Sequence, residues 1–482
     1  MVNEPLLSSK GGLGATAPPP GAISAALVNT LKSVLGTGLL AMPWAMLQLR
    51  EHLALALTMC VLLGLWSCYT MVLLYDCVVL AWPEAHGYSE LVVKALGAPG
   101  GVLCAVNLVL HQILCVAAYL VFVADSLKDV FGGTTAVYIA AATPPVVLLC
   151  WLRDVRALGP ASAIGTAALL AALCVIVYEG CASHTMPTDG LSDAAAGRML
   201  RARHASANLP SLAALGSFAG ITTFTFCGHS EVVTVVRSFG VAHPRDAPYR
   251  RVVVAMGCVA IPAVLAFALS AMRCFGDGLA KNVLLSVHSR TAALLKLLMA
   301  AAVLASCALK MFPAFDVLES ALGIDERARA AVAAAAEGGH DAEGVAVDDR
   351  LNGAPHACDG TPGARAAASA LPGGVHASVG RATGRYALRT TLVLLSAVLS
   401  LACPDFEFFT AFVGAFCNSL ICFVLPPLMY AALLWEHASP PLRVLRRTTA
   451  FVVHTLLASL GLVVLVGGTT SVLREKLMHP SS

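Results

Sequence analysis

Long runs of apolar residues, separated by short polar stretches, make up most of this chain. A helix needs roughly 20 apolar residues to cross the hydrocarbon core of a bilayer, and each run is about that long or longer. We therefore expect an all-α, multi-pass membrane protein with about eleven spanning helices. We also expect a cytosolic N-terminus, because this orientation places most of the Lys and Arg residues of the loops on the cytosolic side. The expected spans are 23–49, 52–81, 100–126, 134–152, 158–178, 212–236, 252–274, 292–312, 387–403, 406–435 and 448–466.

The first apolar run is interrupted near its middle by the residues Gly36, Thr37 and Gly38. Glycine is a weak helix former, so the pattern predicts a break in the helix at this point. A break at membrane depth leaves amide and carbonyl groups unpaired, which is tolerated only where those groups line a protein-walled cavity. We interpret the stretch as a binding site. The alternative is a face of small residues on which two helices pack closely.

The sixth run contains a second interruption, with Phe224, Cys227, Gly228 and His229 at or near membrane depth. Ionisable residues at that depth are costly and usually face a cavity. Five runs precede this one, so the first and sixth runs occupy corresponding positions in two halves of five helices. Paired interruptions in corresponding helices indicate an inverted repeat of the 5+5 type, with substrate held near the bilayer midplane between the two broken helices.

Several motifs in these runs resemble one known family. The first run contains Asn29, Lys32 and Gly-Thr-Gly followed by Pro43, and the sixth reads Phe-Cys-Gly-His-Ser-Glu-Val-Val at 226–233. The eighth run ends in Met-Phe-Pro-Ala-Phe-Asp-Val-Leu-Glu at 311–319, and the tenth contains Val-Gly-Ala-Phe at 413–416 and Leu-Pro-Pro-Leu at 425–428. As a set they resemble the amino acid/auxin permease family of the APC superfamily. The resemblance implies eleven helices, a LeuT-type fold and secondary active transport of amino acids, driven by a proton or sodium gradient.

The cargo that this resemblance implies has a carboxylate and an ammonium group. Unpaired amides at Gly36, Thr37 and Gly38 suit the carboxylate, since a half-helix N-terminus adds partial positive charge. We expect Phe224, Cys227 and Gly228 to line the pocket for the side chain of the amino acid. Ordinary packing is the alternative role for the phenylalanine.

Four residues are candidates for ion coupling. The resemblance implies that Ser306 supplies a hydroxyl ligand to sodium between the first and eighth helices, and Asn29 lies in the same first-helix motif. Lys32, one turn before Gly36, would repel sodium electrostatically. Lys32 and His229 can both titrate, so we favour proton-coupled symport of neutral amino acids. Snorkelling of Lys32 to the membrane edge and a structural role for His229 are the alternatives.

Composition supports an integral membrane protein and no enzyme. Of the 482 residues 58% are hydrophobic and 12% are charged, and the mean hydropathy is +0.79. The net charge of +3 indicates little about partners; we expect an amino acid and the lipid bilayer, and no nucleic acid. No HExxH, CxxC or GxxxxGK[ST] motif occurs, so we predict no catalytic residue, no metal and no cofactor other than a coupling H⁺ or Na⁺.

The expected domain organisation is a disordered cytosolic tail at 1–22, a transporter domain at 23–470 and a C-terminal tail at 471–482. A polar insertion at 322–385 has too few large apolar residues for a core, and we expect a disordered cytosolic loop. The plasma membrane and a vacuolar or lysosomal membrane both fit. A sodium-coupled symporter, or an amino acid sensor with little flux, are the alternative functions.

Overall fold

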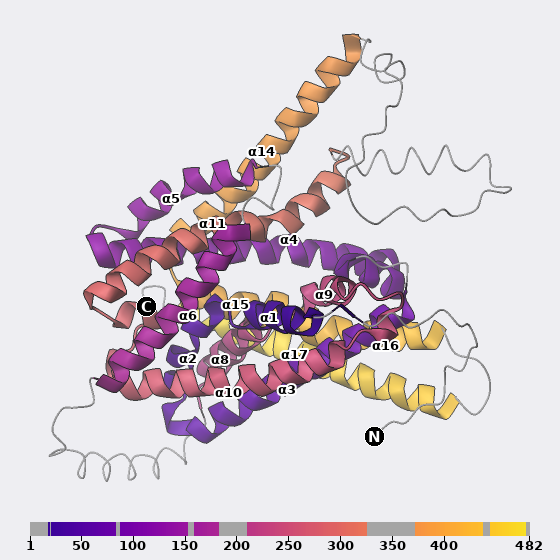
Figure 1. Ribbon diagram of the computed structural model, residues 1–482, viewed down its shortest axis with the longest axis horizontal. Helices are drawn as coiled ribbons and strands as arrows, with labels where there is room; N and C mark the ends of the chain where they lie inside the picture. The colour runs from indigo at the N-terminus through magenta and orange to yellow at the C-terminus, as the bar shows by residue number, and fades with distance from the viewer. Residues whose placement is uncertain are drawn as a thin grey trace.

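The computed structural model describes residues 18–19, 21–82, 87–152, 159–182, 210–324, 372–436 and 444–478. In these ranges all regular structure is helical, and it follows the eleven expected spans in order (Figure 1). The segments are α1–η1–α2 (Ala22–Val34, Thr37–Leu40, Met42–Gln48), α3 (Leu53–Leu80), α4 (Tyr88–Phe131), α5 (Thr135–Cys150), α6 (Gly159–Ala182), α8–η6–α9 (Leu212–Thr225, His229–Glu231, Val232–Ser238), α10 (Tyr249–Phe275), α11 (Arg290–Ala321), α14 (Pro372–Ala402), α15–η11–η12–α16 (Phe406–Val413, Gly414–Asn418, Leu420–Val424, Leu425–Glu436) and α17 (Val444–Met478). Short 3₁₀ turns connect some of them: η2 (Arg50–His52), η7 (Pro244–Asp246), η8 (Gly276–Gly278) and η9 (Val283–Ser286). The expected all-α polytopic class is confirmed, and seven of the described helices are long and apolar enough to cross a membrane alone.

Both expected interruptions are present. The first segment leaves the helical conformation after Val34, and Gly36 is extended, with φ −92° and ψ −160°, before η1 begins. The sixth segment ends its first helix at Thr225, and Cys227 and Gly228 are non-helical before η6 begins. The breaks fall in the first and sixth segments, as a five-plus-five repeat requires.

The third segment begins earlier than its apolar run. It starts at Tyr88, and Gly97 within it has φ +71°, which lies in the left-handed region that favours glycine. Pro99 follows two residues later and cannot donate a backbone hydrogen bond to the preceding turn. The short helix before Gly97, which carries Glu90 and Lys94, and the spanning helix after it therefore meet at a kink, and the apolar pattern detects only the spanning part.

The ends of three later helices extend past their apolar runs. α11 continues through Pro313 to Ala321, and α17 continues to Met478, into the stretch expected as a tail. α14 begins at Pro372, so its first turns occupy residues 372–385, which were expected to be disordered loop. Hydropathy does not detect these turns because they carry few large apolar residues. The rest of that expected loop, at 325–371, and the tail at 1–17 lie outside the described residues.

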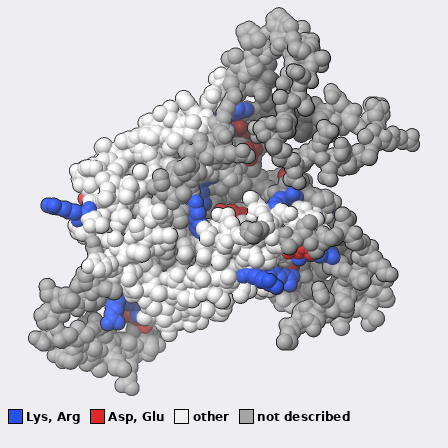
Figure 2. All heavy atoms as spheres, in the orientation of Figure 1, with Lys and Arg blue, Asp and Glu red and all other residues white. Residues whose placement is uncertain are grey.

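Two segments lie at the centre of the bundle. Within the most apolar 18-residue stretch of each helix, 72% of the residues are buried in α4 and 83% in the Phe406–Trp435 segment. The corresponding share in α17 is 17%. The centre of the fold is therefore α4, the tenth segment and the broken helices packed on them, whereas α17 lies at the periphery. On the face drawn in Figure 2, wide areas of the described surface carry no charged side chain, as expected where lipid covers the protein.

Two charged clusters connect different segments of the bundle. In one, buried Arg389 of α14 donates from Nε to Glu319 Oε1 of α11 at 2.7 Å and from Nη1 to the Cys150 carbonyl of α5 at 2.9 Å. In the other, Asp405 accepts at 3.0 Å from both Lys281 Nζ and Lys476 Nζ and caps α15 through the Phe408 N–H. Each cluster therefore ties together parts of the chain that are far apart in sequence.

The Asp405 cluster predicts acid-dependent stability. Burial alone raises the pKa of Asp405, but the charge and hydrogen bond of Lys281, with hydrogen bonds from Phe408 N–H and Lys476, outweigh burial and hold the pKa below its ordinary value of 3.8. A lowered carboxyl pKa contributes stability above the unfolded-state value, and this contribution is lost as pH falls through the folded-state pKa. We expect D405N to lower the melting temperature of the purified protein near neutral pH and to weaken its fall in acid.

The matched control for this prediction is D277N, because the Asp277 side chain is 84% exposed in its ion pair with Arg50 and such pairs contribute little. The control should melt like the wild type across the acid range. An acid dependence in D405N as steep as that of the wild type would contradict the prediction.

Candidate functional site

The two broken segments contact each other at their breaks. A Cβ atom on Gly38 would lie 2.6 Å from Phe224 Cδ1 and 2.9 Å from Thr225 Oγ1, at the end of α8. A Cβ atom on Gly228 would lie 3.3 Å from Ser33 Oγ, at the end of α1. Only glycine allows these approaches without displacing a neighbour, so the glycines bring the breaks together into one site.

α3 supports the sixth-segment break from one side. Ser67 Oγ donates to the Phe226 carbonyl at 2.7 Å, which satisfies an oxygen at the interruption. Thr70 Oγ1 lies 2.8 Å from His229 Nε2. The His229 side chain is fully buried, and its Nδ1 has no hydrogen-bond partner in the part of the chain that the structure describes.

α4 adds a polar face that sequence analysis missed. Asn107, His111, Cys115 and Tyr119 recur at every fourth residue, which places them on one side of the helix. Asn107 Nδ2 donates to the Cys417 carbonyl of the tenth segment at 3.2 Å, and Tyr119 interacts with the side chain of Thr37 at the first break. The four-residue spacing of polar side chains inside the third apolar run was a signal that could have identified this face.

Lys310 of α11 supplies positive charge to the same region. Its ammonium lies within Coulombic range of Tyr119 and Cys115 of α4 and of Cys227 and Glu231 of the sixth segment. No described carboxylate lies within ion-pair distance of its ammonium. Lys296 on the same helix differs, because its buried Nζ donates at 2.6 Å to both Asp129 Oδ2 and the Val287 carbonyl. Lys296 therefore has a structural ion pair, whereas Lys310 adds a cation beside the breaks.

The predicted substrate-binding residues come together, and the ion-coupling candidates mostly do not. Residues 36–38, 224 and 227–228 all lie at or beside the two breaks. Asn29 and Lys32 lie on the exposed side of α1. The hydroxyl of Ser306 donates to the Ala302 carbonyl of its own helix at 2.8 Å. Of the four candidates, only His229 lies at a break.

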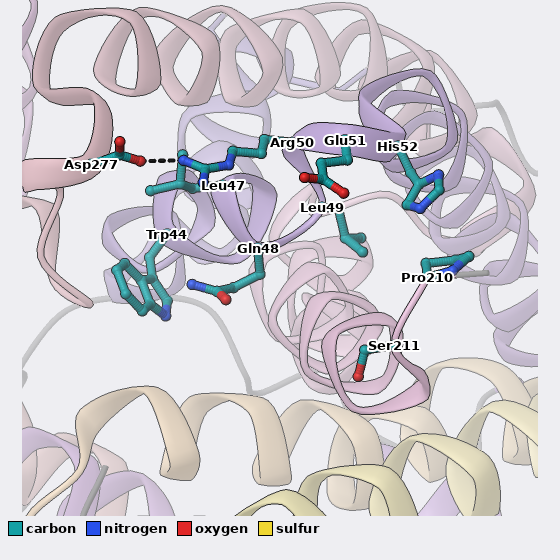
Figure 3. A pocket seen from close by; sticks show the side chains of 10 residues that line it. All are labelled: Trp44, Leu47, Gln48, Leu49, Arg50, Glu51, His52, Pro210, Ser211 and Asp277. Carbon is teal, nitrogen blue, oxygen red and sulfur yellow. Dashed lines mark hydrogen bonds and ion pairs between the residues drawn. The ribbon is translucent and has the colours of Figure 1, made fainter. Parts of the chain in front are cut away.

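A cavity of about 430 Å³ lies away from the breaks, where α2 ends and α8 begins (Figure 3). Trp44, Gln48 and Ser211 are among its lining residues, and Arg50 reaches across to an ion pair with Asp277 at one edge. None of the lining residues belongs to either break, although α2 and α8 run from this cavity to the two breaks.

A multi-pass helical protein whose first and sixth spanning segments are both unwound, with the two breaks in contact, has the architecture of a membrane transporter. The chain belongs to the transmembrane amino acid transporter protein family, whose model matches residues 20–471. This confirms the resemblance found in the sequence and, since the family consists of transporters, the expected non-enzymatic class.

Individual relatives match over shorter regions. Amino acid transporter ANT1 of Arabidopsis thaliana is 29% identical over 161 residues, which cover 32% of this chain and 37% of ANT1. A Bos taurus protein named as a sodium-coupled neutral amino acid transporter is 25% identical over 173 residues, or 33% of this chain and 36% of that protein. The chain thus matches about a third of the length of these curated relatives. A solved Na⁺-coupled sialic acid symporter aligns with 94% of this chain and 96% of its own length at 12% identity, with a TM-score of 0.44.

Proposed function

We propose that the protein is a secondary active transporter that carries neutral amino acids across its membrane by alternating access, in symport with protons. The observation that carries the proposal is the contact between the two breaks beside Lys310. Unwound backbone at this depth supplies amide and carbonyl groups for the two charged ends of an amino acid. Phe224 and Gly228 carry no charge, which favours a neutral side chain on the cargo.

The coupling mechanism follows from the position of the Lys310 ammonium. Lys310 is partly buried, and no described carboxylate lies within ion-pair distance of its ammonium; the carboxylate of an arriving amino acid would supply a direct counter-charge. Protonation of Lys310 and binding of the carboxylate therefore favour each other, and by linkage each increases the affinity for the other. If the transporter changes between its two open states only when the proton and the amino acid are both bound, or when both are absent, it performs proton symport.

Sodium coupling is the second candidate, for one specific reason. Ser306 lies one helical turn before Lys310 on α11, and a hydroxyl is a suitable sodium ligand. An ammonium one turn away would oppose a sodium ion there by charge repulsion, which is why we favour the proton.

The test is uptake of a panel of amino acids into proteoliposomes with imposed pH and sodium gradients. We expect accumulation of neutral amino acids in sodium-free buffer when the outside is acidic, and loss of accumulation when an ionophore removes the pH gradient. Strict dependence on sodium would contradict proton coupling. Failure to carry any amino acid in the panel, by reconstituted and monodisperse protein, would contradict the function itself.

A further inference from the structure

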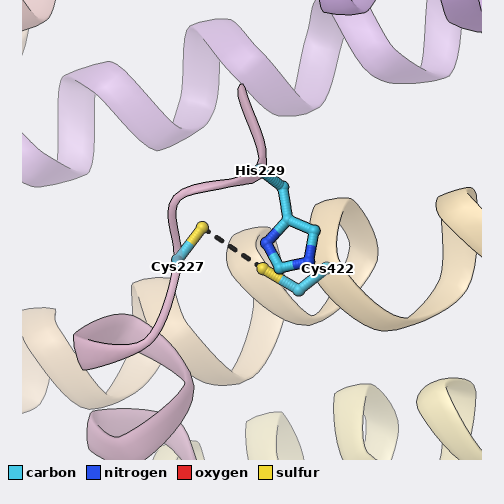
Figure 4. A group of neighbouring side chains, drawn as sticks. All are labelled: Cys227, His229 and Cys422. Carbon is cyan, nitrogen blue, oxygen red and sulfur yellow. Dashed lines mark hydrogen bonds between the residues drawn. The ribbon is translucent and has the colours of Figure 1, made fainter. Parts of the chain in front are cut away.

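Three potential metal ligands converge where the sixth-segment break meets the tenth segment (Figure 4). They are the thiols of Cys227, in the break, and Cys422, in η12, and the imidazole of His229 at the start of η6. One ligand atom of each lies within 4.8 Å of the other two, and Cys422 Sγ lies 3.2 Å from Cys227 Sγ. Two of the three ligands are enclosed, since His229 is fully buried and Cys422 is 1% exposed, and Cys227 is partly buried.

The hydrogen bonds of Thr70 show which nitrogen of His229 is available. Thr70 Oγ1 has the carbonyls of Trp66 and Ser67 within 3.0 Å as acceptors for its proton. With its proton given to a carbonyl, the hydroxyl accepts a hydrogen bond from His229 Nε2–H at 2.8 Å. The neutral imidazole then has its lone pair on Nδ1, which is the buried nitrogen without a described partner. A ring held by one nitrogen with a free lone pair on the other is how proteins present a metal-binding histidine.

We propose that Cys227 Sγ, Cys422 Sγ and His229 Nδ1 form a binding site for a zinc-like divalent metal ion. Zinc accepts sulfur and nitrogen ligands in tetrahedral geometry, and three protein ligands leave the fourth position for water. Two thiolates and one dication sum to zero charge, which suits the low-dielectric interior of a membrane protein, whereas Cu⁺ would leave a net negative charge. Zn–S bonds of about 2.3 Å separate two sulfurs by roughly 3.8 Å, so the pair needs to open only slightly.

The surroundings favour retention of the ion. Leu63, Phe423 and Trp66 pack beside Cys422 and Cys227, with the Trp66 and Phe423 rings stacked at 4.2 Å, and such an apolar shell keeps water away from the ligands. Binding releases the two thiol protons to solvent, because only thiolates coordinate. The bound ion joins the break of the sixth segment to the tenth, so it restrains the part of the fold that substrate release must move. This site goes beyond the proposed function and does not depend on which amino acid is carried.

The test is cobalt titration of purified, reduced, metal-free protein in detergent, followed by displacement with zinc. We expect thiolate-to-cobalt charge-transfer absorption that saturates at one ion per chain and disappears when zinc is added. The variants C422A and H229N should each lose or strongly weaken it. C417S should retain it, because Cys417 is a buried thiol of the same segment outside the ligand group.

Each remaining outcome contradicts the site. Wild-type protein without charge-transfer absorption has no such site, and equal absorption in C422A assigns the signal to other thiols. If the thiols of Cys227 and Cys422 resist alkylation until a reductant is added, and the reduced protein binds no cobalt, the pair forms a disulfide instead. Thermal melts of all variants establish that they are folded, and the result is independent of any transport assay.

Discussion

Replacing Lys310 with methionine is expected to abolish concentrative amino acid uptake while the protein reaches the membrane in normal amounts. Methionine retains an unbranched chain of similar length but removes the ammonium that interacts with Tyr119 and Cys227 beside the breaks. Truncation of one member of a buried charge pair costs roughly 2–5 kcal/mol, which corresponds to a loss of substrate affinity of about thirtyfold or more. Uptake of a radiolabelled substrate into proteoliposomes under an imposed pH gradient measures the effect.

Arginine at position 310 tests separately whether transport needs the positive charge of the side chain or its ability to release a proton. The variant K310R keeps a positive charge, but a guanidinium does not give up its proton in proteins. We expect it to exchange labelled for unlabelled substrate across the membrane and to fail in proton-driven accumulation. If K310M accumulates substrate like the wild type, Lys310 has no part in coupling and the proton hypothesis loses its main support.

Replacing Gly36 with leucine is expected to eliminate uptake with normal membrane levels. Gly36 is extended and needs no glycine-specific conformation, and a Cβ atom there meets only the Ser33 carbonyl, at 3.7 Å. The backbone therefore tolerates a larger residue, and the leucine side chain occupies space beside the break that the substrate needs. The assay is initial uptake rate, normalised to protein in the membrane fraction.

The matched control is G36A, which adds only the tolerated Cβ and should retain most uptake. Because the two variants differ only in side-chain size at one position, loss in the leucine variant alone points to occupied space and not to misfolding. Wild-type uptake by G36L would mean that substrate does not pass beside Gly36.

Sequence alone predicted the breaks, because their cause is local. Glycines near the middle of two apolar runs weaken the helix wherever the rest of the chain lies, so Gly36, Gly38 and Gly228 could be identified without a structure. The residues that contact these glycines could not be identified from the sequence. The approach of Gly38 to Phe224 depends on how two distant segments pack, and no spacing along the chain encodes it.

The ion-coupling candidates show the same limit. Lys32 lies one turn before Gly36 in sequence, yet the buried face of α1 consists of Ala26, Thr30 and Val34, and Lys32 projects from another side. The apolar pattern does not single out Lys310, because its neighbours Tyr119 and Cys227 belong to other segments. Helix phase relative to the core, which an apolar run does not reveal, determines where both lysines lie.

The most direct test of the account is a cryo-EM structure with a transported neutral amino acid bound. We predict density for the substrate between Gly36–Gly38 and Phe226–Gly228, with its carboxylate on the side of Lys310. Substrate bound only in the cavity beside Trp44, with both segments continuous and regularly hydrogen-bonded at these positions, would contradict the central claim.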